Sequence, residues 1–296
     1  PSWEQAFKGN DSQEWACAAD GEYDNLERFG VFLLVPADSV PADEDIFDTM
    51  LLCKVKRGKD NVCLKKKVRC VLCGNQVVAS AKRGLSKTTT DLRTHSPAVR
   101  GSSLKCNFAV GVLDSMRMLD FDIDAAYLQG RYTDRRVFAR APKYFRKYDE
   151  RGVELVWHLQ RALYGGPDSG RVWYNTFAHF LMKEDQITPF QRCHHEPCTF
   201  THFLDGQTDA NGAPKRIICS VYVDDGRTWD NCVDVCDGFY ERLRQRFSIT
   251  MDAGTHFMIG MDISFGDGWL KICSSTYINN MCERWLEYPI AEYDYV

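Results

Sequence analysis

The chain has 296 residues, of which 44% are hydrophobic and 26% are charged, and it carries a net charge of −4 at pH 7. These values are typical of a soluble globular protein with one large or two ordinary domains. No apolar run approaches the roughly 20 residues of a membrane-spanning helix, and no signal peptide is recognisable, which argues against membrane and secreted proteins. The 13 cysteines lie mostly in apolar runs, which favours a reducing intracellular compartment. Because the first residue is Pro1, we expect the chain to be part of a longer protein.

Hydrophobic spacing predicts a series of helices and strands along the chain. The first half of the chain is expected to contain a helical region at 1–29, a strand at 32–35, hairpin strands at 49–57 and 67–79 around a turn at 58–61, a helix at 104–117 and a strand at 119–123. A strand at 155–159, a helix at 170–183 and a loop at 205–215 follow. The rest is expected to contain a strand at 216–223 that continues as a hairpin to Trp229, a helix at 235–247, a strand at 270–272 and a helix from 277. Because helices and strands mix without strict βαβ alternation, the sequence predicts the α+β class.

Acidic residues stand at the ends of two predicted strands that are far apart in sequence. Asp122 falls on the polar face of the alternating strand 119–123, and Asp224 and Asp225 directly follow an apolar run. An Asp-Asp pair in a hairpin turn is ordinary, because Asp favours turns. A matching carboxylate at a second strand end is less ordinary, since two divalent ions about 4 Å apart need hard oxygen ligands from different segments. The pattern predicts a two-metal nucleotidyl-transfer site for Mg²⁺, with Mn²⁺ as an alternative.

A local basic patch lies on this acidic chain. Eight cationic residues stand in one short stretch against a single acid, Asp60: Lys54, Lys56, Arg57, Lys59, Lys65, Lys66, Lys67 and Arg69. Such a patch is available for phosphate groups. A solvated charged face is the ordinary alternative.

Six groups of motifs, in the right order, make the chain resemble the reverse transcriptase of copia-type LTR retrotransposons over about residues 3–285. The motifs are Lys67–Arg69, Thr94–Val99, Asp122–Gly130, Leu163–Gly165 with Arg171–Tyr174, the box Tyr222–Asp225, and Ile259–Ile263 with Tyr277–Ile278. The resemblance implies a right-hand polymerase fold. It would have mainly fingers at 1–117, a palm at 118–265 with inserted fingers-like elements at about 135–170, and the start of a thumb or connection at 266–296.

The resemblance also implies roles for individual residues. Asp122, Asp224 and Asp225 would hold the catalytic metals, with the backbone carbonyl of Ile123 as a further ligand. Tyr127 would be an aromatic steric gate that stacks under the incoming sugar and rejects a 2′-hydroxyl, although a buried core tyrosine is the ordinary alternative. Residues implied to contact the nucleotide are Lys67 and Arg69 at the triphosphate, Asp124, Ala125 and Gly165, and those implied at the template–primer are Tyr222 and Arg171.

The function implied by the resemblance is RNA-directed DNA polymerase activity. A primer 3′-hydroxyl would attack the α-phosphate of a dNTP on an RNA or DNA template and release pyrophosphate. The partners would be the template–primer, the dNTP and the RNase H and integrase domains of a parent polyprotein, with no membrane involved. The expected location is intracellular, in cytoplasmic virus-like particles, with the nucleus as a second location.

Departures from the family pattern leave a second function open. Residues 166–170 read Gly-Pro-Asp-Ser-Gly where the family usually has Leu-Lys-Gln-Ala-Pro. Cys73 stands where a lysine is usual, and Gly226 where an apolar residue is common. The alternative is therefore a catalytically inactive, element-derived module that binds nucleic acid or protein. A third possibility, an RNA-templated RNA polymerase, is disfavoured by the bulky Tyr127.

Two cysteine-containing segments have the residue types of metal sites. Residues 193–198 read Cys-His-His-Glu-Pro-Cys, but no second ligand pair has convincing zinc spacing, and the family has a packing stretch here. Cys70 and Cys73 have redox or metal spacing, but positions i and i+3 of a strand face opposite sides. We expect packing roles for both segments.

Overall fold

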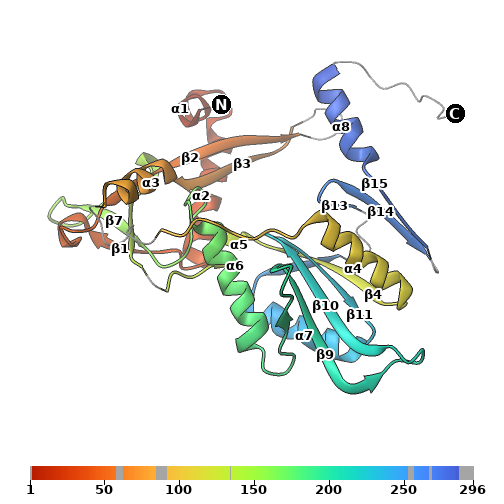
Figure 1. Ribbon diagram of the computed structural model, residues 1–296. Coiled ribbons are helices and arrows are strands. Elements are labelled where there is room, and N and C mark those ends of the chain that lie inside the picture. The colour runs from red at the N-terminus through yellow and green to blue at the C-terminus, as the bar shows by residue number, and fades with distance from the viewer. Residues whose placement is uncertain are drawn as a thin grey trace. The chain divides into compact units, whose positions relative to one another are not determined.

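The computed structural model describes residues 2–57, 63–84, 92–133, 135–252, 257–266 and 269–286 (Figure 1). By its internal contacts the chain divides into two compact units, each built from two segments. Unit 1 comprises Pro1–Ser96 and Ala125–Ala178, and unit 2 comprises Pro97–Asp124 and His179–Val296. The predicted α+β class is confirmed, because each unit combines sheet and helices.

Unit 1 is built on a sheet with the strand order β1-β7-β5-β2-β3, in which β6 also pairs with β7. The β2–β5 pair is parallel and the other described pairs are antiparallel. The strands are β1 (Phe32–Pro36), β2 (Ile46–Arg57), β3 (Cys63–Leu72), β5 (Val137–Arg140), β6 (Lys147–Tyr148) and β7 (Glu154–Leu159). The helices are α1 (Trp3–Lys8), α2 (Ser12–Arg28), α3 (Gly74–Arg83), α5 (Ala126–Gln129) and α6 (Ser169–His179).

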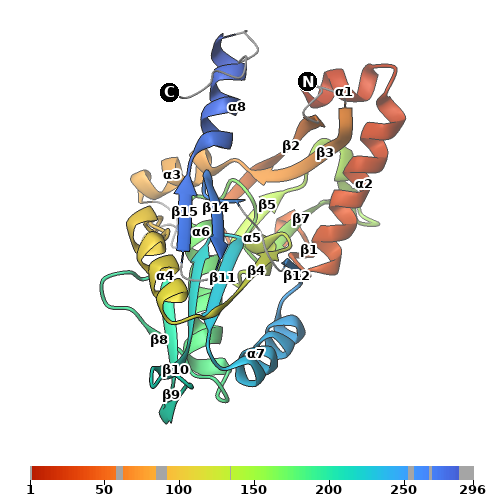
Figure 2. The same cartoon turned by 90° about the vertical axis from the view of Figure 1, so that its right-hand side faces the viewer.

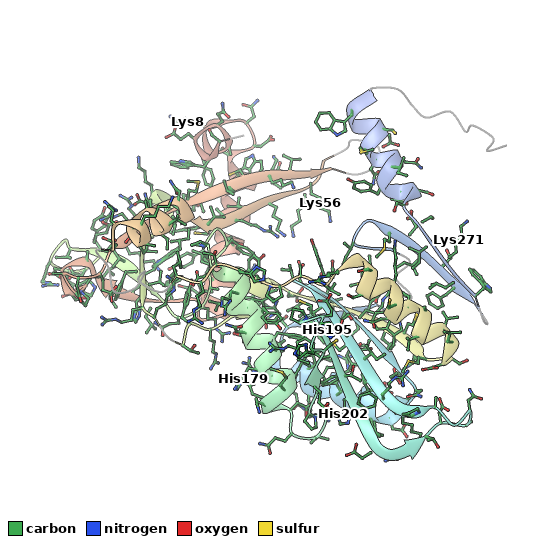
Figure 3. All side chains as sticks on the ribbon, viewed as in Figure 1. Lys8, Lys56, His179, His195, His202 and Lys271 are labelled. Atoms are coloured by element: carbon green, nitrogen blue, oxygen red, sulfur yellow. The ribbon has the colours of Figure 1, made fainter. Side chains whose placement is uncertain are left out.

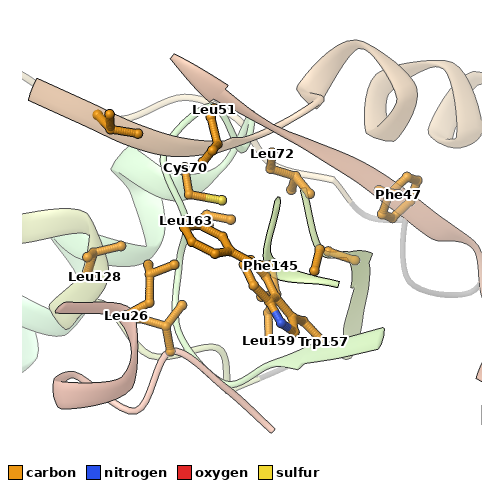
Figure 4. Packing of buried hydrophobic residues seen from close by; sticks show 14 of the residues in the cluster. Leu26, Phe47, Leu51, Cys70, Leu72, Leu128, Phe145, Trp157, Leu159 and Leu163 are labelled. Carbon is orange, nitrogen blue, oxygen red and sulfur yellow. The ribbon is translucent and has the colours of Figure 1, made fainter. Parts of the chain in front are cut away.

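Helix α2 covers this sheet because its apolar side chains recur at helical spacing. Trp15 and Leu26 are buried on one face of the helix. Figure 4 shows Leu26 in the same cluster as Trp157 of β7. On the same face, a carboxylate oxygen of Glu22 accepts the backbone N–H of Cys70 at 2.9 Å. The helix therefore supplies a hydrogen-bond acceptor to β3, the strand at the edge of the sheet.

Unit 2 contains a larger sheet with the strand order β12-β4-β11-β10-β9-β8 and a smaller sheet, β13-β14-β15. The described pairs in both sheets are antiparallel. The strands are β4 (Arg117–Ile123), β8 (Gln191–Arg192), β9 (Thr199–Thr208), β10 (Pro214–Tyr222), β11 (Asp225–Asp230), β12 (Ile249–Asp252), β13 (Phe257–Met258), β14 (Met261–Gly266) and β15 (Trp269–Cys273). The helices are α4 (Gly101–Leu113), α7 (Val233–Arg246) and α8 (Ser275–Leu286).

Helices α4 and α7 cover opposite faces of the larger sheet. Trp229 of β11 packs edge-on against Phe108 of α4, with ring centroids 5.2 Å apart. The preceding residue, Thr228, shares a 2.7 Å hydrogen bond with the hydroxyl of Tyr240 in α7. Successive strand residues point to opposite faces, so the two helices lie on opposite sides of the sheet, as Figure 2 shows.

Most of the predicted elements are confirmed. The confirmed strands are those at 32–35, 119–123, 155–159 and 270–272, and the confirmed helices are those within 1–29, at 170–183, at 235–247 and from 277. After α6, the helix at 170–183 continues as a π-helical turn over Phe180–Glu184. The hairpin that carries the acidic pair is also confirmed, because β10 and β11 pair directly. The predicted turn at 58–61 lies outside the described residues.

The predicted strand at 67–79 is wrong beyond Leu72. Residues 74–83 form helix α3 instead, in which Val77 and Ser80 are buried three residues apart. The helix ends at Gly84, whose φ of +64° is the left-handed conformation that favours glycine at a helix end. The β-branched Val77–Val78 pair favoured a strand, but burial at helical spacing outweighs that propensity.

Two further predicted boundaries are wrong. Helix α4 ends at Leu113 and not at 117, because Ser115 has a φ of +50° and the chain turns there into β4. The predicted loop at 205–215 shrinks to 209–213, because β9 and β10 extend until Thr208 pairs with Pro214. Asp209 closes this loop, since one carboxylate oxygen accepts the backbone N–H of both Asn211 and Ala213.

The two units divide the chain at other points than the predicted fingers, palm and thumb ranges. Helix α4 belongs to unit 2 although it precedes residue 118, and residues 135–170 belong to unit 1. The assignment of fingers, palm and thumb stays a prediction. Among the described residues, no helix is both long enough and apolar enough to cross a lipid bilayer.

Candidate active site

The two acidic segments lie side by side at one end of the larger sheet of unit 2. Asp122 of β4 and Asp225 of β11 are direct cross-strand partners. Asp224 belongs to the two-residue turn between β10 and β11, because Tyr222 pairs with Asp225. The backbone N–H of Ile123 donates to the carbonyl of Asp224 at 2.9 Å, which ties the turn to β4. The fold thus brings three predicted metal ligands together from segments about a hundred residues apart.

The carboxylates of Asp122 and Asp225 share a sheet face with a buried ion pair. Two residues further along each strand, Asp120 and Arg227 are cross-strand partners, and their side chains contact each other. Arg227 is only 2% exposed, and its guanidinium lies 4.7 Å from the centre of the Phe108 ring in α4. Because strand residues two apart share a face, the carboxylates lie on the α4 side, with a buried cation nearby.

The site concentrates negative charge. Partial burial, followed in effect by the carboxylates of Asp224, Asp122 and Asp120, raises the pKa of Asp225 to about 6. Asp122, Asp224 and Asp225 are all exposed to solvent, whereas Phe121 and Ile123 beside them are buried. Carboxylate oxygens are the ligands that Mg²⁺ and Mn²⁺ prefer, and a divalent cation would relieve the repulsion.

The donor chemistry of the site therefore fits a hard divalent cation. Within the described part of the chain, however, no group of three or more His, Cys, Asp or Glu side chains is arranged so that it could hold a metal ion. Backbone register places the predicted ligands at one place, and their side chains reach solvent there.

The turn that carries Asp224 has an uncommon backbone conformation. Val223 has a φ of +60°, although β-branched residues rarely adopt left-handed conformations. Such strain persists where surrounding structure holds it, and it is typical of functional sites. Pairing of β10 with β11 on one side of the turn and the Ile123–Asp224 hydrogen bond on the other supply that support.

Gly226 departs from the family pattern for a packing reason. It pairs with Phe121 across β4 and β11, and a Cβ atom at Gly226 would overlap the Phe121 ring. The aromatic ring of one strand thus fills the space that an apolar side chain on the other would occupy. The departure at Gly226 is matched by its neighbour and does not loosen the site.

Asp124 and Ala125, both predicted to contact the nucleotide, lie where the chain leaves β4. The backbone N–H of Asp124 donates to the carbonyl of Ser248 at 3.0 Å, and the Ser248 hydroxyl donates to the Asp124 carboxylate at 2.8 Å. Ala125 has a φ of +48° and begins the turn into α5. Asp124 is thereby held against the segment before β12, and its nucleotide contact stays a prediction.

Three side chains of unit 1 form a contact series that includes two predicted nucleotide-binding residues. The Arg69 guanidinium of β3 lies 4.8 Å from the centre of the Tyr164 ring. The Tyr164 ring in turn lies 5.7 Å from the ring of Tyr127 in α5, at an interplanar angle of 59°. Sequence reasoning placed Tyr164 in a motif but gave it no role. Only the contacts of its ring show that Tyr164 lies between Arg69 and Tyr127 in this series.

Gly165 follows Tyr164 and has its own packing reason to be glycine. Its φ is +79°, and a Cβ atom there would lie 2.5 Å from the carbonyl oxygen of Leu72 at the end of β3. The backbone N–H of Leu72 donates to the carbonyl of Tyr164 at 2.7 Å. The close approach that glycine permits is thus between two segments of unit 1, while contact with a nucleotide or template stays a prediction.

The basic patch of the sequence separates into two faces of the β2–β3 hairpin. Cross-strand pairing of Lys54 with Lys67 and of Lys56 with Lys65 places four lysines on one exposed face. Lys56 is labelled on this hairpin in Figure 3. Arg69 shares this face, where it pairs with Leu52. Burial, and next the charge of Arg69, lower the pKa of Lys67. We use the name basic face for Lys54, Lys56, Lys65, Lys67 and Arg69.

Lys66 does not belong to the basic face. Its ammonium group lies 2.5 Å from a carboxylate oxygen of Asp11 and 3.0 Å from one of Glu14. It also lies 5.6 Å from the centre of the Trp15 ring. The predicted local basic patch therefore does not include Lys66, because strand alternation turns Lys66 towards α2. Lys59 and the side chain of Arg57 lie outside what the structure describes.

The predicted template–primer residues belong to different units. Arg171 of α6 donates to the backbone carbonyl of His95 at 3.2 Å within unit 1. Tyr222 pairs with Asp225 within unit 2. The predicted metal ligands also belong to unit 2, whereas Lys67, Arg69, Tyr127 and Gly165 belong to unit 1. The roles of these residues towards nucleic acid stay predictions.

The other family departures are built into unit 1. The Asp168 carboxylate lies 2.6 Å from Arg135, and both side chains are nearly buried. The Ser169 hydroxyl donates to the carbonyl of Leu163 at 2.6 Å. The backbone N–H of Cys73 donates to the carbonyl of Asp48 at 2.8 Å.

The Cys-His-His-Glu-Pro-Cys segment at 193–198 is partly buried in unit 2, where it is hydrogen-bonded to the backbone of Arg100. Glu196 is buried, and its carboxylate accepts the backbone N–H of Arg100 at 3.1 Å. Cys198 is also buried, whereas His194 and His195 are exposed. Glu196 and Cys198 are thus part of the buried interior of unit 2, and the packing role expected for this segment stays a prediction.

Comparison with known proteins gives a family match over most of the chain. The family described as "Reverse transcriptase (RNA-dependent DNA polymerase)" matches residues 37–286. Two curated proteins of Arabidopsis thaliana, the retrovirus-related Pol polyproteins from transposons RE1 and RE2, are 23% and 24% identical to the chain over 196 residues. These alignments cover 64% of this chain and 12% of each polyprotein, so the chain spans only a small part of the relatives' length.

Similar solved structures include two telomerases. Apo telomerase from Candida Tropicalis has a TM-score of 0.46 and 8% identity, covering 90% of this chain and 54% of that one. Telomerase from Candida albicans in complex with a telomeric RNA fragment has a TM-score of 0.40 and 11% identity, covering 88% and 51%. This similarity is too distant to carry a functional argument, and the family assignment rests on the match over 37–286.

Proposed function

Because this chain belongs to the reverse transcriptase (RNA-dependent DNA polymerase) family, we propose that it is an RNA-directed DNA polymerase domain with its catalytic centre at Asp122, Asp224 and Asp225. The observation that supports this most strongly is the cross-strand pairing of Asp122 with Asp225, beside the turn that holds Asp224. The relatives are polyproteins from transposons, so we extend the proposal to a polymerase segment of such a polyprotein.

The reaction is attack of a primer 3′-hydroxyl oxygen on the α-phosphorus of a dNTP, with pyrophosphate as the leaving group. Asp122, Asp224 and Asp225 supply hard oxygen ligands, and the backbone carbonyl of Ile123 is a further candidate ligand. When bound, two Mg²⁺ or Mn²⁺ ions lower the pKa of the attacking hydroxyl and neutralise charge on the transferred phosphate. The residues themselves position the reacting groups and take part in no covalent step.

We assign nucleotide contacts to three residues of unit 1. We assign Tyr127 as the aromatic gate under the sugar. The ordinary alternative, a fully buried core tyrosine, is disfavoured because the Tyr127 side chain is only partly buried. Lys67 and Arg69 are assigned to the triphosphate, since both lie on the exposed basic face. Arg69 is suited to bidentate phosphate contact by its planar guanidinium.

We assign template and primer contacts to Lys54, Lys56 and Lys65 of the basic face and to Arg171 in unit 1, and further contacts to Tyr222 in unit 2. Partial burial and, next, the charge of Arg69 lower the pKa of Lys67 on this surface, and phosphate groups would offset the like charges there. We also propose that the segment works inside the cell, beside RNase H and integrase domains of a longer polyprotein.

The test is primer extension on an RNA template with Mg²⁺ or Mn²⁺, comparing the chain with Asp224→Asn. Loss of even an outer-shell residue typically costs about 10–100-fold, so losing a metal ligand should cost more than about 100-fold. Asp205→Asn is the matched control, because Asp205 is an exposed carboxylate on β9 of the same sheet. Unchanged extension by Asp224→Asn would contradict the assignment of roles.

The second candidate, an inactive binding module, differs in a measurable way. Steeply salt-dependent binding of primer–template without dNTP incorporation would support it. The observation in its favour is the exposed basic face, which could bind nucleic acid without catalysis. The third possibility, an RNA-templated RNA polymerase, would incorporate rNTPs in preference to dNTPs. A comparison of rNTP with dNTP incorporation therefore distinguishes it from the other two candidates.

A further inference from the structure

Tyr164 is the middle member of the contact series in unit 1. Its ring faces the Arg69 guanidinium at 4.8 Å and the Tyr127 ring at 5.7 Å. Arg69 comes from β3 and Tyr127 from α5, two elements separated by more than fifty residues. No hydrogen bond or direct contact between Arg69 and Tyr127 is needed to link them, because one aromatic ring touches both.

The backbone of Tyr164 is held firmly at this place. Its carbonyl accepts the Leu72 N–H at 2.7 Å, at the end of the strand that carries Arg69. Gly165 beside it approaches Leu72 so closely that a Cβ atom would lie 2.5 Å from the Leu72 carbonyl oxygen. A Cβ atom at Gly74 would likewise overlap the carbonyl oxygen of Gly165. The ring therefore projects from an anchored backbone.

We infer that Tyr164 is a positioning residue that couples the triphosphate-binding Arg69 to the sugar-sensing Tyr127, an inference that rests on the proposed function. The Tyr164 ring holds the Arg69 guanidinium through a cation–π contact and the Tyr127 ring through a tilted aromatic contact. A change at either neighbour is transmitted through Tyr164, so nucleotide affinity and sugar selection depend on one side chain.

The central experiment measures dNTP affinity and sugar selection in Tyr164→Leu. Loss of the two ring contacts is expected to raise KM for dTTP about three- to tenfold and to lower the dTTP-over-rUTP preference by a similar factor. Tyr164→Phe keeps the ring and should stay within about twofold of wild type on both measures. A merely structural role would lower kcat and thermal stability together and leave the selection ratio unchanged, and that result would overturn the inference.

Two controls keep the result interpretable. Tyr148→Leu removes an aromatic ring from β6 that is 60% exposed, and it should change neither KM nor selection. If Tyr164→Leu fails to fold, Tyr164→Met removes the ring while keeping a flexible side chain of similar reach. Unchanged KM and selection in a folded Tyr164→Met would also overturn the inference.

A second readout separates this inference from the proposed function. Equilibrium binding of dTTP to a complex with a dideoxy-terminated primer–template needs no chemistry. If the wild-type chain binds dTTP but does not extend primers, weaker binding by Tyr164→Leu supports the coupling while the polymerase proposal fails. If the wild-type chain extends primers and Tyr164→Leu binds dTTP as tightly as wild type, the polymerase proposal stands and the coupling through Tyr164 is overturned. A wild-type chain that neither extends primers nor binds dTTP overturns both.

Discussion

Replacing Asp225 by asparagine should stabilise the metal-free protein while abolishing its proposed activity. Burial and the neighbouring carboxylates raise the pKa of Asp225 from 3.8 to about 6. A shift of about two pKa units corresponds to about 3 kcal/mol, and solvent screening of exposed carboxylates reduces this to about 1 kcal/mol. For a unit of this size, about 1 kcal/mol corresponds to an increase in Tm of about 2–4 °C.

The pH dependence of this gain has a definite sign. Because the folded-state pKa lies above the unfolded-state value, the folded state keeps its proton between about pH 4 and pH 6 while the unfolded chain loses it. Wild-type stability therefore falls as pH rises through this window, and the full penalty is present above about pH 6. Asp225→Asn should exceed wild type in Tm at pH 8 and lose most of that advantage near pH 4.

The assay is thermal unfolding in EDTA at pH 4 and pH 8, with Asp205→Asn as a control for the change in net charge. Mg²⁺ should then stabilise wild type more than Asp225→Asn, because the variant has lost a ligand. If Asp225→Asn gains no more at pH 8 than Asp205→Asn does, the carboxylates do not crowd one another and the electrostatic argument is refuted.

Further predictions concern packing and nucleic-acid binding. Gly226→Ala should destabilise the protein by about 1–3 kcal/mol through overlap with Phe121, and Phe121→Leu in the same chain should restore part of the loss in thermal unfolding. The double change Lys54→Gln and Lys56→Gln should reduce the salt slope of single-stranded RNA binding by about 0.7 per lysine, as measured by titration at several salt concentrations. Lys66→Gln should leave that salt slope unchanged, because Lys66 is paired with carboxylates away from the basic face. If Lys66→Gln reduced the slope as much as each change on the basic face does, the division of the hairpin into two faces would be contradicted.

Local patterns alone identified several elements, for reasons that do not depend on the rest of the fold. Alternation in 119–123 predicted both the strand and its acidic face, because side chains of a strand alternate by covalent geometry. The i, i+4 spacing of Phe239 and Leu243 predicted α7 in the same way. The order of the motifs predicted the family, which the match over 37–286 confirms.

Local patterns failed where a distant neighbour decides the conformation. Val77 and Val78 favour a strand by propensity, but burial of one helical face made residues 74–83 a helix. The 205–215 segment looked like a loop because of its Gly, Asn and Pro content, yet pairing between β9 and β10 extends into it. Propensity differences are small, about 1 kcal/mol, and tertiary packing or cross-strand pairing easily outweighs them.

The sequence by itself determined which residue types are available, and the tertiary structure decided which of them meet. Asp122, Asp224 and Asp225 could be predicted as metal ligands, but only the β4–β11 register makes two of them direct partners. Lys66 and Lys67 are adjacent in sequence, yet strand alternation sends them to opposite faces. The role inferred for Tyr164 depends on contacts between residues far apart in the chain, and no local spacing encodes such contacts.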